Sequence, residues 1–293
     1  MKVYKLTQFL LLFLLILTAF VEAHPSHEPG HEALEKKLRL GVLPDAAHES
    51  LQKRVQPLIQ YLTEETGIKF QYIRVNNYEE LLESFYEREI DFAWFGGYTF
   101  VKAQLQDRAI PLIMRDVDFK FSSYFLVRKN HPANSIFDFK NKVIAFGSRL
   151  STSGHLMPRY FLSNNNIIPE NYFSEVRYSG KHDTTLKWVR DGTVDLGVTN
   201  SKIIDRMLRE DGSLQKEIRV IWETPPYSNY VWAIHPSISE HTQIAVRDAF
   251  LSLSGENPEH KKILDQWNAR KFYPASIEDF LIIRKIVKKL KQE

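Results

Sequence analysis

The chain contains no cysteine, which excludes disulfide bonds and a lipid anchor on a cysteine behind a signal peptide. With 293 residues, of which 43% are hydrophobic, it has enough apolar material for a core without such cross-links. It also lacks the Gly-Lys-Ser/Thr sequence of a Walker loop and the Gly-x-Ser-x-Gly elbow of a serine hydrolase. These absences disfavour a disulfide-stabilised module, a P-loop protein and a hydrolase.

An excess of charge of one sign is missing as well. Without Lys2, Lys5 and Glu22, which precede the mature chain proposed below, 37 basic and 35 acidic side chains leave a net charge of +2. The basic run at 284–291 alternates with apolar residues at helical spacing, which predicts a solvated helix face. We therefore expect no nucleic-acid partner, because a nucleic-acid footprint needs a larger positive balance.

The N-terminal residues have the pattern of a signal peptide. Lys2 and Lys5 supply the positive start, an almost unbroken apolar run follows at 9–20, and residues 21–23 offer the cleavage site. The alternative is a retained membrane anchor, but the run is shorter than the roughly 20 apolar residues of a bilayer span. We predict a cleaved signal peptide over residues 1–23 and a soluble, monomeric periplasmic protein.

A histidine-rich segment follows the predicted cleavage site. His24 and His31 bound its most polar part, which carries three histidines in all. Weak metal binding is one interpretation, but a zinc site needs a fixed fourth ligand and an ordered second shell, which the pattern does not predict. We interpret residues 24–36 as a flexible leader and expect no metal site and no cofactor.

Hydrophobic runs alternate with helical patterns along the remaining chain, as in α/β proteins. The pattern predicts a first series with strands at 38–43, 70–75, 90–95 and 110–114 and helices at 51–66, 78–88 and 98–106. A second series predicts strands at 123–128, 142–146, 176–178, 196–199, 218–222 and 230–234, with helices at 154–163, 184–190 and 202–209. We expect two lobes, each a mostly parallel sheet flanked by helices, with a helical tail from Ser239 packed on the first lobe. The predicted limits are 37–125 plus 226–293 for lobe 1, and 126–225 for lobe 2.

Three consecutive hydroxyl residues, Ser151, Thr152 and Ser153, stand where a buried strand passes through a loop into a helix. Hydroxyls at that position donate to an anion together with the free N–H groups and the positive end of the helix dipole. Gly154 lets the backbone approach closely. A helix cap is the alternative, but a cap needs only one such residue. The run therefore favours an anion site.

Other candidate residues also lie between a strand and a helix. His182 follows the strand at 176–178, and ligands of α/β proteins bind at such strand ends. In the first series, Gly97 and Tyr98 begin a helix with exposed N–H groups, and Tyr78 opens another helix. The alternatives are a structural histidine and ordinary packing of the tyrosine.

Together these motifs resemble the substrate-binding proteins of phosphate, phosphite and phosphonate ABC importers, over about residues 38–271. The resemblance rests on the opening Leu-Gly-Val-Leu-Pro, on Asp-Phe-Ala-Trp-Phe-Gly, and on Ser-Thr-Ser-Gly followed by Gly-Lys-His-Asp and Gly-Thr-Val-Asp-Leu-Gly. It implies the two-lobed periplasmic clamp, of type II, with the ligand between the lobes. It also implies that a tetrahedral oxyanion is held by Ser151, Thr152, Ser153, His182 and Tyr78.

The chain departs from this family at the loops that hold an ammonium group in aminophosphonate binders. Acidic residues stand there in those relatives, whereas this chain offers Lys202 after Asn200, and Asn229. Neither a lysine nor an amide neutralises an ammonium group. We therefore predict an amine-free ligand, such as a phosphonate, phosphite or phosphate ester, including one with a second anionic or polar end. Asn200 and Asn229 join Gly97 and Tyr98 as further expected ligand-binding residues.

The sequence thus predicts a periplasmic solute-binding protein, not an enzyme, that delivers an oxyanion to an ABC permease. The same clamp could instead report its ligand to a membrane sensor kinase, or could have changed to a sulfate-like or organic anion. A hydrolase is the third alternative, since Ser151, His155, His182 and Asp183 include the residue types of a triad. The adjacency of His182 and Asp183 argues against it, because neighbouring residues are poorly placed to orient one another.

Overall fold

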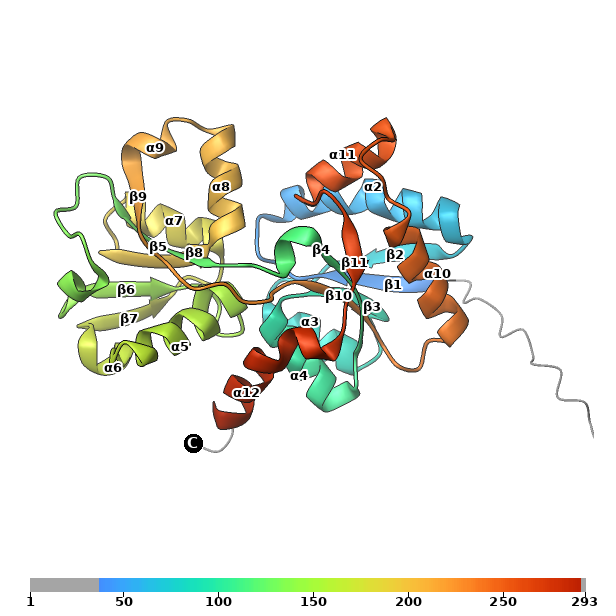
Figure 1. Ribbon diagram of the computed structural model, residues 1–293, viewed down its shortest axis with the longest axis horizontal. Coiled ribbons are helices and arrows are strands. Elements are labelled where there is room, and N and C mark those ends of the chain that lie inside the picture. The colour runs from blue at the N-terminus through green and yellow to red at the C-terminus, as the bar shows by residue number, and fades with distance from the viewer. Residues whose placement is uncertain (1–36, 291–293) are drawn as a thin grey trace, which may run out of the picture. The chain divides into compact units, whose positions relative to one another are not determined.

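The computed structural model describes residues 37–290 (Figure 1). The predicted signal peptide at 1–23 and the leader at 24–36 lie outside the described residues. Across the described part of the chain, no helix combines the length and apolar character required to traverse a bilayer.

Six strands form the first sheet, in the order β11-β4-β10-β3-β1-β2. Strand β1 is parallel to both β2 and β3, and β10 is antiparallel to its neighbours β3 and β4. The strands are β1 (Lys37–Val42), β2 (Lys69–Ile73), β3 (Phe92–Phe95), β4 (Ile110–Arg115), β10 (Val231–Ile234) and β11 (Phe272–Pro274).

Five strands form the second sheet, in the order β7-β6-β8-β5-β9. Strand β6 is parallel to β7 and β8, whereas β5 is antiparallel to both β8 and β9. The strands are β5 (Ser123–Arg128), β6 (Val143–Phe146), β7 (Glu175–Tyr178), β8 (Leu196–Asn200) and β9 (Ile218–Glu223).

The chain passes between the sheets twice, after β4 and after β9, and this confirms the two-lobed α/β fold. Both sheets are mixed rather than purely parallel. Three strands run against the others in their sheets: β5, β10 and β11. The strands β5 and β10 are the first that the chain forms after each crossing, so they enter their sheets from the opposite end. The predicted lobe limits at 125 and 225 stay a prediction. In the structure, the chain leaves the first sheet between β4 and β5 and returns to it between β9 and β10.

Helices cover the first sheet, and the C-terminal tail contributes several of them. Helix α2 is held by an apolar stripe that includes the buried Leu51, Val55, Leu58 and Leu62, and it ends at Gly67 in the left-handed conformation (φ 70°). Helices α10 and α11 pack on α2, and α12 packs on α4. The helices are α2 (His48–Thr66), α3 (Tyr78–Tyr86), α4 (Gly97–Asp107), α10 (Glu240–Leu251), α11 (Pro258–Gln266) and α12 (Leu281–Leu290).

The three predicted helices of the second lobe are present, one of them with a π-helical start, and the structure adds two short helices that the pattern does not predict. The helix expected from Gly154 begins as a π-helical turn, η3 (Thr152–Leu156), before α5 (Met157–Asn164) continues it. The others are α6 (Pro169–Tyr172), α7 (His182–Arg190), α8 (Ser201–Glu210) and α9 (Leu214–Glu217). Short 3₁₀ turns complete the chain at η1 (Asp116–Asp118), η2 (Ile136–Phe139) and η4 (Ile277–Phe280).

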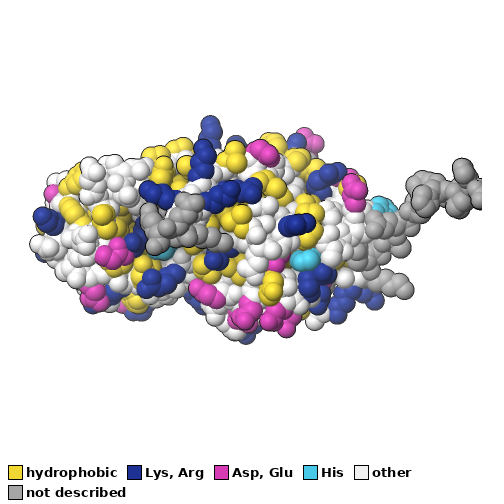
Figure 2. All heavy atoms as spheres, turned by 90° about the horizontal axis from the view of Figure 1, so that it is seen from below, with side chains coloured by type: hydrophobic (Ala, Val, Ile, Leu, Met, Phe, Trp, Pro, Cys, Tyr) yellow, Lys and Arg dark blue, Asp and Glu magenta, His cyan; other side chains and the backbone are white. Residues whose placement is uncertain are grey.

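Aromatic side chains dominate the core of the first lobe. Trp94, Trp232 and Trp267 are fully buried, and Trp94 stacks on Tyr230 with ring centroids 4.2 Å apart. The second lobe has two separate apolar clusters, one around Phe125 and the other around Leu126. Successive strand residues point to opposite faces of a sheet, so these clusters show that helices cover both faces. On the surface, Lys and Arg side chains are interspersed with acidic ones (Figure 2).

Candidate oxyanion-binding site

The Ser-Thr-Ser run follows β6 and forms the start of η3, with all three side chains buried. Ser151 Oγ accepts a hydrogen bond of 2.9 Å from Gly154 N, so this residue does cap the turn. Thr152 Oγ1 accepts from Tyr98 N at 2.8 Å. In both residues the oxygen accepts from a backbone N–H. The hydroxyl hydrogen of Thr152 is left to donate to an anion, whereas the hydroxyl of Ser151 is also hydrogen-bonded to Tyr78.

Ser153 faces a second set of hydroxyls. It lies beside Tyr227, whose hydroxyl also contacts Ser123 Oγ at 2.5 Å. Burial raises the pKa of Tyr227 well above its usual range, so the phenol stays protonated and can donate. The predicted site thus gains Tyr227, which follows β9 in a Pro-Pro-Tyr segment that carries no ligand-binding pattern of its own.

His182 opens α7 and is 1% exposed. Its Nδ1 lies 3.3 Å from Asn200 N and 3.2 Å from Thr199 Oγ1. A backbone N–H can only donate, so Nδ1 accepts, and a neutral ring must carry its proton on Nε2. Burial lowers the pKa of His182, which keeps the ring neutral at pH 7. Nε2 is buried and has no hydrogen-bond partner among the described residues, so its N–H is available to donate to a ligand.

Gly154 permits the approach of His182 to the Ser-Thr-Ser turn. A Cβ at this position would lie 3.0 Å from His182 Cε1 and 3.0 Å from Ser151 Oγ. These distances show that the imidazole and the Ser151 hydroxyl both border Gly154, where only a residue without a side chain leaves them room. The structure therefore brings together the two motifs that the sequence placed in separate loops.

Tyr78 begins α3, whose cap is Asn77, and is 2% exposed. Its hydroxyl lies beside Ser151, so the first lobe reaches the Ser-Thr-Ser turn at this point. Burial raises the pKa of Tyr78 well above its usual range, and the nearby Asp45 carboxylate raises it further. The phenol is a neutral donor at physiological pH.

The Gly96-Gly97 turn contacts the second lobe through Tyr98 N, and Gly97 N donates to Asn229 Oδ1 at 3.1 Å. A Cβ on Gly97 would come within 2.6 Å of Ile283 Cδ1, so α12 packs directly behind this turn. Asn229 Nδ2 is buried without a hydrogen-bond partner among the described residues. Both predicted N–H donors of this turn are used within the protein, and the Asn229 amide is the group left to donate.

Asn200 lies next to His182, but its side chain has hydrogen-bond partners of its own. Its Oδ1 caps α8 by accepting from Ile203 N at 3.0 Å, and its Nδ2 donates to Tyr230 OH at 2.7 Å. Tyr230 OH in turn donates to Asp45 Oδ2 at 2.7 Å. This network links the second lobe to the first and contains two residues, Asp45 and Tyr230, that the sequence analysis missed. Asp45 follows β1 closely, and its place at the carboxyl end of a strand is the signal that could have found it.

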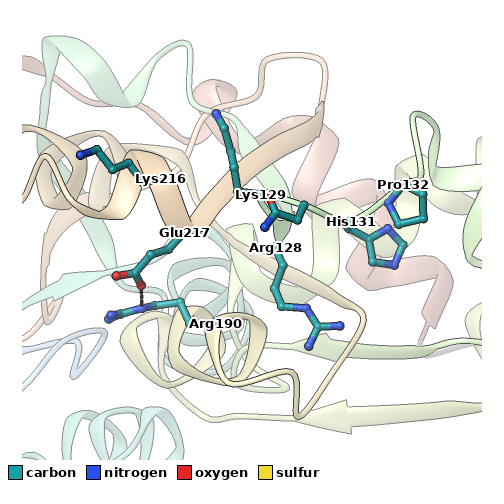
Figure 3. A pocket seen from close by; sticks show the side chains of 8 residues that line it. Arg128, Lys129, His131, Pro132, Arg190, Lys216 and Glu217 are labelled. Carbon is teal, nitrogen blue, oxygen red and sulfur yellow. Dashed lines mark hydrogen bonds and ion pairs between the residues drawn. The ribbon is translucent and has the colours of Figure 1, made fainter.

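A larger hollow lies elsewhere in the second lobe. It has a volume of about 560 Å³ and is lined mainly by basic side chains, among them Arg128, Lys129 and Lys216 (Figure 3). Arg128 ends β5 opposite Ile218, whereas the other end of β5 pairs with Asn200 at the polar cluster. This hollow therefore lies at the opposite end of the sheet from the predicted site, and Arg190 there forms an ion pair with Glu217.

Two lobes built on mixed sheets, joined by two crossings and carrying buried donors at the strand ends between them, define a two-lobed solute-binding protein. The chain belongs to the family of periplasmic substrate-binding proteins of phosphonate ABC transporters, whose family model matches residues 40–280. The members of this family bind a substrate for a transporter and are not enzymes.

Two relatives named as binding proteins match most of the chain. One is the probable ABC transporter phosphite binding protein PhnD1 of Prochlorococcus marinus, 32% identical over 87% of this chain and 90% of that protein. Another is the phosphonates-binding periplasmic protein of Escherichia coli, 27% identical over 88% of this chain and 78% of that protein. The solved structure of PhnD1 in complex with methylphosphonate superposes with a TM-score of 0.83, covering 88% of this chain and 99% of that one.

Proposed function

We propose that this protein captures a phosphonate- or phosphite-like anion in the periplasm and presents it to an ABC permease. The observation that carries the proposal is the convergence of buried donors from both lobes on one place. His182 Nε2 and Asn229 Nδ2 both lack a partner among the described residues, and both can only donate in the arrangement present. A group of unpaired, buried donors requires an acceptor with several oxygens, which a tetrahedral oxyanion supplies.

In this proposal the hydroxyls of Ser151, Thr152 and Ser153, together with His182 Nε2, bind the anion from the second lobe. Tyr78 OH and Asn229 Nδ2 bind it from the first lobe. Gly97 and Tyr98 act through their N–H groups, which hold Asn229 and Thr152 in position. Asn200 acts through its N–H, which sets the tautomer of His182. The anion binds one lobe first, and the other lobe then closes over it by a hinge motion.

The ligand is proposed to lack an amine. Asn229 presents its amide nitrogen rather than a carboxylate, and Lys202 lies 4.0 Å from Asp205 beside a cavity with three arginines. An ammonium group there would find one carboxylate, Asp45, but several positive side chains, and their repulsion costs free energy.

Two alternatives are weaker. A hydrolase needs an acidic residue that orients the imidazole. The described contacts of His182 Nδ1 are instead to Asn200 N and Thr199 Oγ1. Asp183 Oδ1 accepts from Thr184 N. A sensory clamp would have the same interior, and the similarity to ABC-transporter components favours import.

Replacement of Thr152 by alanine should weaken anion binding by roughly tenfold or more, because one donor to a charged oxygen is lost. Tyr98 N would also lose its acceptor. Calorimetric titration measures the affinity. Ser163→Ala, an exposed serine at the end of α5, is the control and should leave binding unchanged.

The test of the function is a thermal-shift screen of residues 24–293 with phosphate, phosphite, methylphosphonate, 2-aminoethylphosphonate, phosphate esters and sulfate. A ligand at about 100 times its Kd adds roughly 2.7 kcal/mol of stability, which raises the melting temperature by several degrees. We expect the largest rise with an amine-free phosphorus anion. A rise with sulfate alone, or with no phosphorus anion, would refute the proposed ligand class.

A further inference from the structure

The proposed anion-binding residues are called the oxyanion cluster below: Tyr78, Ser151, Thr152, Ser153, His182 and Asn229. A small cavity lies beside this cluster, where residues of both lobes meet. Its buried walls come from the first lobe through Asp45, Arg54 and Tyr230, and from the second lobe through Asn200. Lys202 and Arg206 of α8 also line it. The cavity has a volume of about 20 Å³, which is the room of about one water-sized atom.

Two opposite charges face each other across this cavity without a hydrogen bond between them. Arg54 Nη2 lies 3.9 Å from Asp45 Oδ1, beyond hydrogen-bonding distance. Arg54 is 9% exposed and Asp45 is 2% exposed. Asp45 Oδ1 and Arg54 Nε and Nη2 have no hydrogen-bond partner among the described residues. Buried charged groups are normally hydrogen-bonded, so a small group that hydrogen-bonds to both side chains would stabilise this pair.

The arginine is held by packing rather than by hydrogen bonds. Its guanidinium lies 5.3 Å from the centroid of the Trp94 ring and 4.8 Å from that of Trp267. Burial lowers the pKa of Arg54 to about 10, so the group still carries its charge at pH 7. The polar edge of Arg54 is thus fixed in place and available to donate.

The chemistry of the cavity selects one kind of group. An ammonium could donate to Asp45 but would be repelled by Arg54, Lys202 and Arg206. A carboxylate could accept from Arg54 but would be repelled by Asp45, and it needs more room. A neutral hydroxyl accepts from Arg54 and donates to Asp45 Oδ1 with a single heavy atom, so it satisfies both groups.

The cavity adjoins the oxyanion cluster through shared residues. Asn200 lines the cavity and donates its N–H to His182 Nδ1. Tyr230 lines it too and follows Asn229 directly in the chain. The Asp45 carboxylate is also close enough to act on both Tyr78 and His182: it adds to the rise that burial causes in the pKa of Tyr78, and it opposes the lowering that burial causes in the pKa of His182. A short substituent on an anion held by these donors therefore lies near the cavity.

We propose that the space between Asp45 and Arg54 binds a hydroxyl group on the organic arm of the ligand, so that the protein prefers small hydroxyalkyl phosphonates. This inference rests on the proposed function, because it takes the phosphorus group to be held by the oxyanion cluster. It extends that function by naming the substituent that the site selects.

The experiment compares matched ligands by calorimetric titration of the wild-type protein. The pairs are methylphosphonate with hydroxymethylphosphonate, and ethylphosphonate with 2-hydroxyethylphosphonate; 2-aminoethylphosphonate and phosphonoacetate are charged analogues. We expect the hydroxylated member of at least one pair to bind roughly tenfold tighter than its alkyl partner, from hydrogen bonds to charged groups. Both charged analogues should bind more weakly than 2-hydroxyethylphosphonate.

Variants then locate the preference. Arg54→Met keeps the apolar stem over the tryptophans but cannot donate, and Asp45→Ala removes the acceptor; either should reduce the hydroxyl preference to less than about threefold, as expected when a charged partner is lost. Arg190→Gln, in the distant hollow of Figure 3, should keep the full preference.

Equal affinities within both wild-type pairs, or tighter binding of a charged analogue than of 2-hydroxyethylphosphonate, would overturn the inference and leave the proposed function intact. Failure of every phosphorus anion to bind would instead refute the proposed function, and the inference with it. The wild-type comparison decides the question even if a variant does not fold.

Discussion

Replacement of Asn229 by aspartate should weaken the binding of phosphite and methylphosphonate by roughly 100-fold or more. Asn229 is 1% exposed, and its Nδ2 has no partner among the described residues. Loss of a hydrogen bond to an ionised oxygen costs about 1.5–3 kcal/mol. A carboxylate near the anion adds repulsion of about 4 kcal/mol at a separation of 4 Å and an effective dielectric constant of 20.

The fold of the Gly96-Gly97 turn should survive this change, since an aspartate oxygen can still accept from Gly97 N. Calorimetric titration should therefore show lost affinity in a protein with a nearly normal melting temperature. The ratio of affinities should also move toward 2-aminoethylphosphonate, because the new carboxylate suits an ammonium group. Asn171→Asp, on the exposed face of α6, is the matched control and should bind like the wild type. An Asn229→Asp protein with unchanged affinity would remove Asn229 from the site.

Replacement of His182 by alanine should weaken anion binding by roughly 10- to 100-fold. The ring accepts from Asn200 N through Nδ1, so its Nε2–H is fixed as a donor in a buried position. A donor to a charged acceptor contributes about 1.5–3 kcal/mol. The measurement is the Kd for phosphite and methylphosphonate at pH 7.

Stability serves as the second measurement for this variant. Asn200 N loses its acceptor, so we expect a moderate decrease of the melting temperature without ligand. The decrease should be larger with ligand, because weaker binding adds less stability. His131→Ala, in the distant hollow of Figure 3, should leave the affinity unchanged. If His182→Ala lowered stability but bound the anion normally, His182 would be a structural histidine, as the alternative interpretation has it.

Much of this architecture was readable from local pattern. The order of the main strands and helices follows from hydrophobic periodicity, and α2 ends at Thr66, the end of the helix predicted at 51–66. The Ser-Thr-Ser run and His182 are candidates because each follows a strand and begins a helix, which is where α/β proteins bind ligands. Local sequence carries such features, since the residues that form them are close together in the chain.

The tautomer of His182 could not be read in this way. It depends on Asn200 N, which approaches the ring only because β8 and α7 lie side by side in the folded lobe. The two N–H groups of the Gly97 turn are a similar case. The sequence suggested that they are free to hold an anion, whereas the structure pairs them with Asn229 and Thr152. Hydrogen-bond partners that are distant in sequence are chosen by packing.

The sequence by itself determined the class of protein, the two α/β series and the residue types proposed to bind a tetrahedral anion, because periodicity and the strand–loop–helix motif are local. Only the tertiary structure decided which of those donors stay unpaired and which charges share a cavity. Tyr230 meets Asp45 across 185 residues of chain. Arg54 faces the same carboxylate because α2 packs against β2 of the first sheet and the tryptophans hold its side chain. Such pairings depend on how whole helices and strands pack together, and that packing is decided by contacts throughout the domain.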